Sequence, residues 1–265
     1  MMLMVDMGNS ALKWATLNQN QLSPQQRILY KKDGLDSILT QVWLTLEVPW
    51  QGIFVSNVAG LLNANILSDW TERHWGLEVT FVKTSSNQCG VKNGYTNPEQ
   101  LGVDRWLALI GAHCLATGKL CVIDCGTAIT VDVLSIDGQH QGGLIIPGMA
   151  TMYHALANNT YALEQPELLN NNWDEVINSV QQTFPQDREN LSLAHKTNAG
   201  IRLGALYAAV GLIEYVMHTL NKQENSTTTL LTGGSVPLLK PFLQKSYQYV
   251  PDLVLQGLKN IVNQT

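Results

Sequence analysis

The amino-acid sequence predicts an α/β protein made of two similar domains. The main observation is an internal repeat: residues 2–16 and residues 121–134 each read as an apolar strand ending in an acid, a glycine turn and a second, alternating strand. Strands also alternate with amphipathic helices through both halves, which is the pattern of α/β proteins. With 45% hydrophobic and only 14% charged residues among 265, the composition favours well-buried cores.

After its strand pair, the first half alternates between strands and helices. Short apolar or alternating runs predict strands, and apolar residues at helical spacing predict helices. The predicted strands are residues 26–30, 52–56 and 78–82, and the predicted helices are residues 35–46, 61–75 and 106–115.

The second half continues from its strand pair through a two-residue hairpin turn at Asp137-Gly138. The boundary between the halves is placed near Thr117-Gly118-Lys119, which gives domains of residues 1–117 and 118–265. A strand over residues 228–231 is expected to stop at Gly233-Gly234. Helices are predicted over residues 200–220, 236–245 and 252–262, and polar loops at residues 170–172 and 221–226.

Composition and charge narrow the function classes. The formal net charge is −5 and no run of Lys or Arg is present, so a nucleic-acid partner is not expected. Backbone donors and a metal can still bind an anionic substrate such as ATP. The chain reaches Asp6 without a basic or long apolar leader, and no stretch approaches the ~18 apolar residues of a membrane span. Four cysteines without a Cys-x-x-Cys pair predict reduced, mostly buried thiols, so we expect a cytoplasmic protein without a membrane partner.

The first candidate site is the turn that begins at Asp6. Gly8 lets backbone N–H groups approach an anion, Ser10 offers a hydroxyl, and Lys13 returns a cation along the second strand. Asp6 would then hold Mg²⁺, directly or through water. An ordinary hairpin with a surface turn explains this segment equally well when it is taken alone.

The second candidate is the turn from Asp124 to Thr127, which presents the same chemistry together with the Thr130 hydroxyl. A plain hairpin again explains it in isolation. Two such turns in one chain favour a nucleotide clamp, because the phosphates of a nucleotide need two binding turns that face one cleft. The later pair Gly233-Gly234 suits a flat adenosine against the backbone, although most such pairs are only turns.

A further candidate lies where residues 97–102 form a constrained loop before an apolar helix. Asp104 and Arg105 stand together at the start of that helix, and an adjacent acid and base suit substrate chemistry. Asp104 as a helix cap and Arg105 as a solvated charge are the alternatives, and spacing alone favours the cap. No P-loop, dinucleotide fingerprint, zinc-protease motif or Gly-x-Ser-x-Gly elbow occurs, and the six histidines show no metal-ligand spacing.

Four motifs occur in a characteristic order along the chain. They are Asp6-x-Gly-Asn-Ser-x-x-Lys13, Tyr95-x-x-Pro-x-x-Leu-Gly-x-Asp-Arg105, Asp124-x-Gly-Thr-Ala-x-Thr130 and Gly142-Gly-x-Ile-x-Pro-Gly148. Together they resemble the type III pantothenate kinase family, also known as Bvg accessory factors, over essentially the whole chain. The resemblance implies the actin-like and sugar-kinase-like ATPase fold, with two ribonuclease-H-like halves around a nucleotide cleft. Ser10 stands where the family usually has threonine, which keeps the hydroxyl.

The resemblance also implies a reaction and a set of roles. The reaction is ATP-dependent phosphorylation of pantothenate to 4'-phosphopantothenate, the first step of coenzyme A biosynthesis, in a homodimer. Asp104 would be the general base that takes the proton from the primary hydroxyl of pantothenate, and Arg105 would pair with its carboxylate. Asp124 would coordinate K⁺ or NH₄⁺. ATP would be bound by Asp6, Met7, Gly8, Asn9, Ser10, Ala11, Leu12, Lys13 and Thr127, with Asp6 near Mg²⁺, and pantothenate by Tyr95, Gly102, Val103, Asp104, Arg105 and Thr197.

Two other interpretations stay open. One keeps the fold but changes the substrate, to give a sugar or acetate-type kinase or a phosphatase, and the Gly-x-Asp-Arg segment argues against it. The other is a non-catalytic regulator that keeps the fold and binds partners. Such a protein could lose Asp6, Asp104 or Asp124 without penalty, whereas all three are present.

Overall fold

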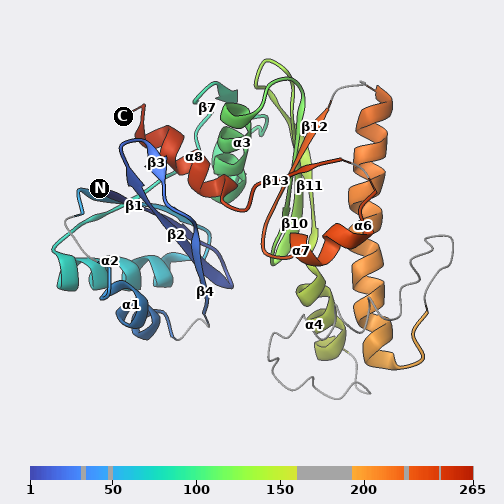
Figure 1. Cartoon of the computed structure of the whole chain (residues 1–265), viewed down its shortest axis with the longest axis horizontal. Helices are drawn as coiled ribbons and strands as arrows, with labels where there is room; N and C mark the ends of the chain where they lie inside the picture. Colours follow the sequence, from blue (N-terminus) through green and yellow to red (C-terminus); the bar gives the residue numbers. More distant parts are fainter. Residues whose placement is uncertain (31–33, 47–49, 160–192, 224–226, 245, 265) are drawn as a thin grey trace. The chain divides into compact units, whose positions relative to one another are not determined.

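The computed structural model describes residues 1–30, 34–46, 50–159, 193–223, 227–244 and 246–264 (Figure 1). The chain divides into two compact units. The first unit comprises Met1–Val122, Asp132–Gly143 and Val250–Thr265, and the second comprises Ile123–Val131 and Leu144–Tyr249. The expected division into domains 1–117 and 118–265 refers to the two repeated halves of the sequence, and it stays a prediction.

A six-stranded mixed sheet forms the first unit's framework, in the order β3-β2-β1-β5-β6 with β4 also paired to β2. Strand β1 runs antiparallel to β2 and parallel to β5, and β5 runs parallel to β6. Parallel neighbours need crossover connections, and helices supply them here. The strands are β1 (Met2–Met7), β2 (Ala11–Asn18), β3 (Gln21–Leu22), β4 (Gln26–Leu29), β5 (Gly52–Asn57) and β6 (Val79–Phe81), and the helices between them are α1 (Leu35–Trp43) and α2 (Leu61–Trp75).

The two faces of this sheet have different roles because successive strand residues point to opposite sides. Leu3, Val5 and Met7 of β1 join a buried hydrophobic cluster with side chains of α1 and α2. Trp43 and Trp70 of those helices are fully buried in it and meet edge-on, with ring centroids 6.0 Å apart. Asp6 therefore lies on the opposite face of β1 from this cluster.

Helices α3 (Val103–Leu115) and α8 (Leu253–Val262) also belong to the first unit, and they approach each other closely. A Cβ on Gly257 would overlap the carbonyl oxygen of Leu107, and a Cβ on Gly111 would overlap the carbonyl oxygen of Leu253. Backbone therefore packs against backbone where the two helices cross, and this contact fixes α3. The remaining small elements of the unit are β7 (Asn87–Gln88), β8 (Val91–Lys92) and the 3-10 helix η1 (Pro98–Gln100).

The second sheet has five strands in the order β11-β10-β9-β12-β13. Helix α6 is the longest described element, and Figure 1 shows it as one uninterrupted rod. The strands of this sheet are β9 (Leu120–Cys125), β10 (Ala128–Leu134), β11 (His140–Pro147), β12 (Thr228–Thr232) and β13 (Gln248–Tyr249), and the helices of the second unit are α4 (Met149–Asn159), α6 (Thr197–Gln223), α7 (Val236–Leu239) and the 3-10 helix η2 (Lys240–Phe242).

The expected α/β class with two sheets is confirmed, and most predicted elements occur within a few residues of their expected bounds. The helix expected at residues 236–245 is wrong: α7 ends at Leu239 and gives way to η2. Pro241 explains the break, because it lacks the N–H that a continuing helix needs, whereas Pro237 stands in the first turn of α7, where that N–H has no partner in the helix. Residues 221–223, expected in a loop, extend α6, whereas the predicted loop at 170–172 lies outside the described residues.

Helix α6 has the length and the apolar composition of a membrane-spanning helix, although the sequence contains no uninterrupted run of about 18 apolar residues. A single such helix is weak evidence for a membrane span, since core helices of water-soluble proteins can have the same length and composition.

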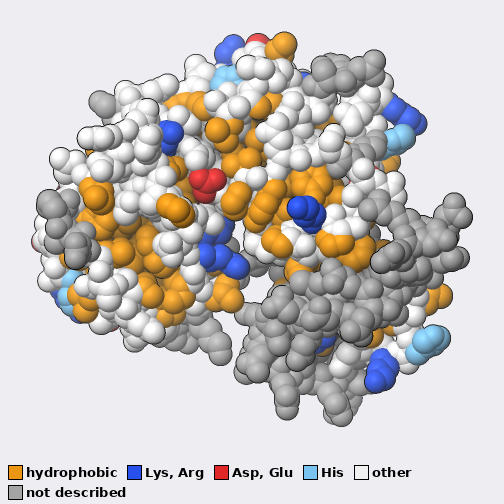
Figure 2. Space-filling view, viewed as in Figure 1, with side chains coloured by type: hydrophobic (Ala, Val, Ile, Leu, Met, Phe, Trp, Pro, Cys, Tyr) orange, Lys and Arg blue, Asp and Glu red, His pale blue; other side chains and the backbone are white. Residues whose placement is uncertain are grey.

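The thiols are less buried than expected. All four cysteines are free, but only Cys121 and Cys125 are buried, and Cys114 is exposed. On the face that Figure 2 shows, charged side chains are few and stand apart among hydrophobic and polar ones.

The close crossing of α3 and α8 predicts how a substitution at Gly257 changes the free energy of unfolding. Gly257→Ala should lower the free energy of unfolding by about 1–3 kcal/mol, because the new methyl group must push the helices apart. Gly211→Ala in α6 is the matched control, since a Cβ there meets nothing within 4 Å. It should leave stability unchanged or raise it by up to about 1 kcal/mol. Urea unfolding of both variants checks this, and equal stabilities would contradict the packing account.

Candidate functional site

Asp6 is held at the end of β1 by its neighbour across the strand pair. Asp6 and Lys13 are register partners in β1 and β2, and Lys13 Nζ lies 3.0 Å from Asp6 Oδ2. Asp6 is 3% exposed. The alternative of an ordinary hairpin required Asp6 to lie on the surface of a turn, so its burial argues against that alternative. Its second oxygen, Oδ1, is buried and has no hydrogen-bond partner among the residues that the structure describes. An unpaired carboxylate oxygen is costly to bury, which makes it a candidate to bind a cation or a donor.

The turn between these strands is tied to the rest of the first unit. Gly8 N–H donates to the Ala11 carbonyl at 3.1 Å, and the Tyr30 hydroxyl donates to the Gly8 carbonyl at 2.6 Å. Burial, and then the charge of Asp6, raises the pKa of Tyr30 to about 12, so Tyr30 keeps its proton and remains a donor at neutral pH. Asn9 and Ser10 complete the turn and are exposed. The backbone of the turn is therefore fixed before any ligand arrives.

Asp104 lies in the first turn of α3, two residues after the N-cap Gly102. Its Oδ1 accepts a hydrogen bond from the backbone N–H of Arg105 at 2.8 Å. Asp104 therefore satisfies one of the backbone N–H groups that have no partner within the helix, although Asp104 is not the N-cap residue. Burial, and then the nearby charge of Asp6, raises the pKa of Asp104, while Arg105 and Lys13 oppose the shift. The charge of Asp6 thus acts on Asp104, and the raised pKa makes Asp104 a stronger base than an ordinary aspartate.

Arg105 is not a solvated charge. It is 7% exposed, and its Nε and Nη2 donate to Asp132 Oδ2 and Oδ1 at 2.8 and 2.6 Å. Asp132 is itself only 2% exposed. Burial alone would lower the pKa of Arg105, but the hydrogen bonds and charge of Asp132 outweigh it and raise the pKa. This two-pronged geometry is the strong form of an ion pair.

Tyr95 and His140 complete a polar network around Arg105. Arg105 Nη1 donates to the Tyr95 hydroxyl at 2.9 Å, and the guanidinium lies 5.6 Å from the centroid of the Tyr95 ring. The His140 ring stacks on Tyr95 with centroids 5.8 Å apart and planes 12° apart. His140 Nε2 lies 2.9 Å from Asp132 Oδ1 and donates to it, because an ionised carboxylate can only accept.

The turn that begins at Asp124 lies in the second unit and is gripped by close backbone contacts. The Thr127 carbonyl accepts the Gly148 N–H at 2.9 Å and the Thr151 hydroxyl at 2.6 Å, and the Cys125 carbonyl accepts the Ser235 N–H at 2.9 Å. Gly233 has a φ of +96°, and a Cβ there would lie 2.5 Å from the Cys125 carbonyl. Only glycine fits this approach.

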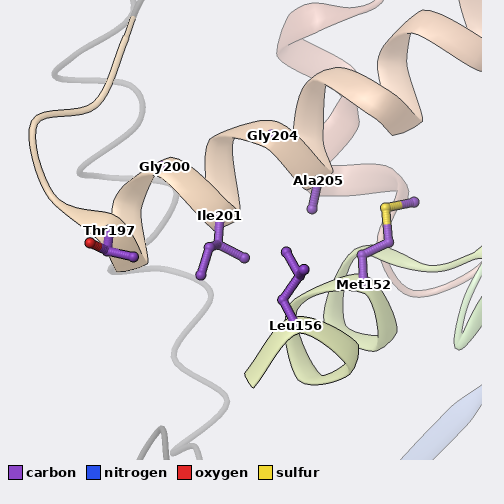
Figure 3. Close-up of a pocket in the computed structure, with 7 residues that line it drawn as sticks. All are labelled: Met152, Leu156, Thr197, Gly200, Ile201, Gly204 and Ala205. Carbon is purple, nitrogen blue, oxygen red and sulfur yellow. The ribbon is translucent and has the colours of Figure 1, made fainter. Parts of the chain in front are cut away.

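Thr197 begins α6 and is exposed at the edge of a cavity of about 480 Å³. Figure 3 shows Ile201 and Ala205 of α6 opposite Met152 and Leu156 of α4. Apart from Thr197 the labelled side chains are apolar. The lining residues are Met152, Leu156, Thr197, Gly200, Ile201, Gly204 and Ala205.

The predicted site residues fall into two groups. The first unit contains Asp6 to Lys13, Tyr95 and Gly102 to Arg105, and within it the structure brings Asp6, Lys13 and Asp104 into electrostatic contact and Tyr95 onto Arg105. The second unit contains Asp124, Thr127 and Thr197. Among the described residues there is no group of three or more His, Cys, Asp or Glu side chains that could hold a metal.

Sequence reasoning missed Asp132 and His140. Asp132 was visible as an acid inside an otherwise apolar strand, where a buried carboxylate requires a partner. His140 lies two residues after the predicted Asp137-Gly138 turn. No local pattern could pair either residue with Arg105, because Asp132 is 27 positions away from it.

Comparison with known proteins identifies the family of this chain. The family model for type III pantothenate kinase matches residues 2–219. A type III pantothenate kinase from Nitrosococcus oceani is 36% identical, covering 100% of this chain and 95% of the relative. Another from Nitrosomonas eutropha is 34% identical, covering 97% of this chain and 92% of the relative.

The fold is shared with a crystal structure from Campylobacter jejuni described as a Baf family transcriptional activator. It has a TM-score of 0.57 at 20% identity and covers 99% of this chain and 98% of its own. At that identity the likeness shows the fold alone, whereas the family match and the closer relatives extend over the sequence motifs as well. The chain belongs to the type III pantothenate kinase family.

Proposed function

We propose that this protein phosphorylates pantothenate with ATP to give 4'-phosphopantothenate, the first step of coenzyme A biosynthesis. Relatives at 34–36% identity over nearly the whole chain carry the name of this activity. Of the structure's features, the one that best supports the proposal is Asp104, a half-buried carboxylate of raised pKa at the start of α3, next to Arg105. This is the arrangement that a kinase needs to accept a proton from an alcohol.

Asp104 acts as the general base in this proposal. It accepts the proton of the primary hydroxyl of pantothenate as that oxygen forms a bond to the γ-phosphorus of ATP and the bond to the ADP oxygen breaks. The raised pKa makes Asp104 a better proton acceptor than an exposed aspartate. Its bond to the Arg105 N–H holds one oxygen in place and leaves the other for the substrate.

ATP with a divalent metal supplies the phosphoryl group, as in kinases generally. The segment from Asp6 to Lys13 would bind its phosphates, with the backbone of the turn after Gly8, the Ser10 hydroxyl and the Lys13 ammonium as donors. The buried, unpartnered Oδ1 of Asp6 fits a place near Mg²⁺, a hard cation that prefers carboxylate oxygens. Lys13 keeps Asp6 in position through Oδ2.

Arg105 would orient the carboxylate of pantothenate. Three of its five N–H donors are used by Asp132 and Tyr95 among the described residues, which leaves two for a substrate. Tyr95, Gly102 and Val103 would complete this part of the binding site. Thr197, at the mouth of the cavity between α4 and α6, would also contact pantothenate.

The remaining assignments rest on the family resemblance. Asp124 would hold K⁺ or NH₄⁺, since a carboxylate beside closely packed backbone carbonyls suits a weakly held monovalent cation. Thr127 would contact ATP. The protein would act as a homodimer in the cytoplasm.

The direct experiment is a coupled ADP-release assay with ATP, with and without added K⁺. Pantothenate should be phosphorylated with K⁺ present, whereas sugars and short acids should not. Absence of pantothenate phosphorylation under both conditions would favour the regulator interpretation, and turnover of a sugar would favour another kinase of the same fold. Equal rates with and without K⁺ would remove the monovalent cation from the proposal.

Asp104→Asn should retain ATP binding but lose about two to four orders of magnitude in kcat, the usual contribution of a positioned base. Asparagine keeps the acceptor for the Arg105 N–H but cannot take a proton. Steady-state kinetics with pantothenate and direct titration with ATP check this. Near wild-type turnover would remove Asp104 from the base role.

The same substitution should stabilise the protein at neutral pH. The raised pKa means that the charged carboxylate is less favourable in the folded protein than in the unfolded chain, so stability is lost as pH rises through the folded-state pKa. Asp104→Asn should therefore have the higher free energy of unfolding at pH 8, and the difference should vanish below the ordinary aspartate pKa of about 3.9. A variant less stable than wild type at pH 8 would contradict the assigned environment.

Asp6→Asn should raise the KM for Mg-ATP roughly tenfold or more, because a charge-assisted contact is lost at the phosphate turn. The KM for pantothenate should change much less. Asp69→Asn, an exposed acid on α2, is the matched control and should leave both constants unchanged. Unaltered nucleotide kinetics in Asp6→Asn would refute the Mg²⁺ assignment.

A further inference from the structure

We propose that Asp132 and His140 are positioning residues for substrate binding: they hold Arg105 and Tyr95 in the geometry that recognises the pantothenate carboxylate. This inference rests on the proposed function. Asp132 and His140 stand in β10 and β11, away from the Gly-x-Asp-Arg motif in sequence, but within the same compact unit.

Asp132 fixes the direction of the guanidinium. Its two oxygens accept Nε and Nη2 of Arg105, so rotation about the last side-chain bonds of Arg105 would break both contacts. A single contact would allow the guanidinium to swing, whereas two parallel contacts define its plane. The N–H groups that Asp132 and Tyr95 do not use therefore keep fixed directions.

His140 fixes Asp132 and Tyr95 together. Its Nε2–H donates to Asp132 Oδ1, and its ring stacks nearly parallel on Tyr95, whose hydroxyl accepts from Arg105 Nη1. The contacts form a closed ring of four side chains, in which each member has two partners. His140 Nδ1 is buried without a hydrogen-bond partner in the described part of the chain, so Nε2 is the ring nitrogen that takes part in the network.

The network also reaches the proposed base. The backbone N–H of Arg105 donates to Asp104 Oδ1, so anything that moves Arg105 also moves the donor that holds Asp104. A role in stability alone is a weaker explanation, because desolvation cancels most of what a buried ion pair gains and an apolar replacement is often as stable. The network instead fixes the orientation of Arg105 and Tyr95.

The test is the pair of KM values, measured for pantothenate and for ATP in the full-length protein. Asp132→Asn should raise the pantothenate KM about 10- to 100-fold, the effect of losing a charge-assisted hydrogen bond, and leave the ATP KM within about twofold. His140→Phe keeps a ring to stack on Tyr95 but loses the Nε2–H. It should raise the pantothenate KM roughly three- to tenfold, and it serves if Asp132→Asn does not fold.

Asp137→Asn is the matched control, because it removes the same charge from an exposed turn between β10 and β11. It should leave both KM values unchanged. Calorimetric titration of pantothenate into each variant should show the same loss as the KM. The inference is overturned by an unchanged pantothenate KM in both variants, or by equal increases in both KM values, which is what general loosening of the fold would give. Wild-type protein that does not phosphorylate pantothenate at all would instead contradict the proposed function, and the inference with it.

Discussion

The buried ion pair between Arg105 and Asp132 is the interaction on which the first unit's site depends. Both side chains are almost fully removed from solvent, and removing one partner of such a pair typically costs about 3–5 kcal/mol. The pair joins the start of α3 to the middle of β10, and α3 is in turn locked against α8 by glycine contacts. Asp104 therefore stands on a helix end that is fixed on two sides.

A second constraint acts on Asp6 and Asp104. Burial, and then the charge of Asp6, raises the pKa of Asp104, whereas Lys13 opposes that shift and also forms an ion pair with Asp6. Their environments differ, since Asp6 has an ion-pair partner whereas Asp104 has only a backbone donor. Placing two acids in different surroundings is a general way for an active site to separate metal binding from proton transfer.

Local patterns in the sequence predicted much of this arrangement. The strand, acid and glycine turn at Asp6 read correctly, because strand alternation and turn chemistry are local properties. The contacts of Asp132 and His140 with Arg105 and Tyr95 could not be predicted, since these partners come from distant parts of the chain and one sequence carries no signal for such pairing. The break after Leu239 has a local signal in Pro241, although the apolar spacing of residues 236–245 favours one continuous helix. The residue roles came from the family motifs, since spacing alone favoured a simple helix cap for Asp104.

A crystal structure with pantothenate and a non-hydrolysable ATP analogue tests the central claim most directly. The account predicts that the primary hydroxyl of pantothenate lies within hydrogen-bond distance of Asp104, about 2.6–3.2 Å. It also predicts that the carboxylate meets Arg105 while both contacts of Arg105 with Asp132 persist. A hydroxyl that points away from Asp104, or an Arg105 that leaves Asp132 to reach the substrate, would contradict it.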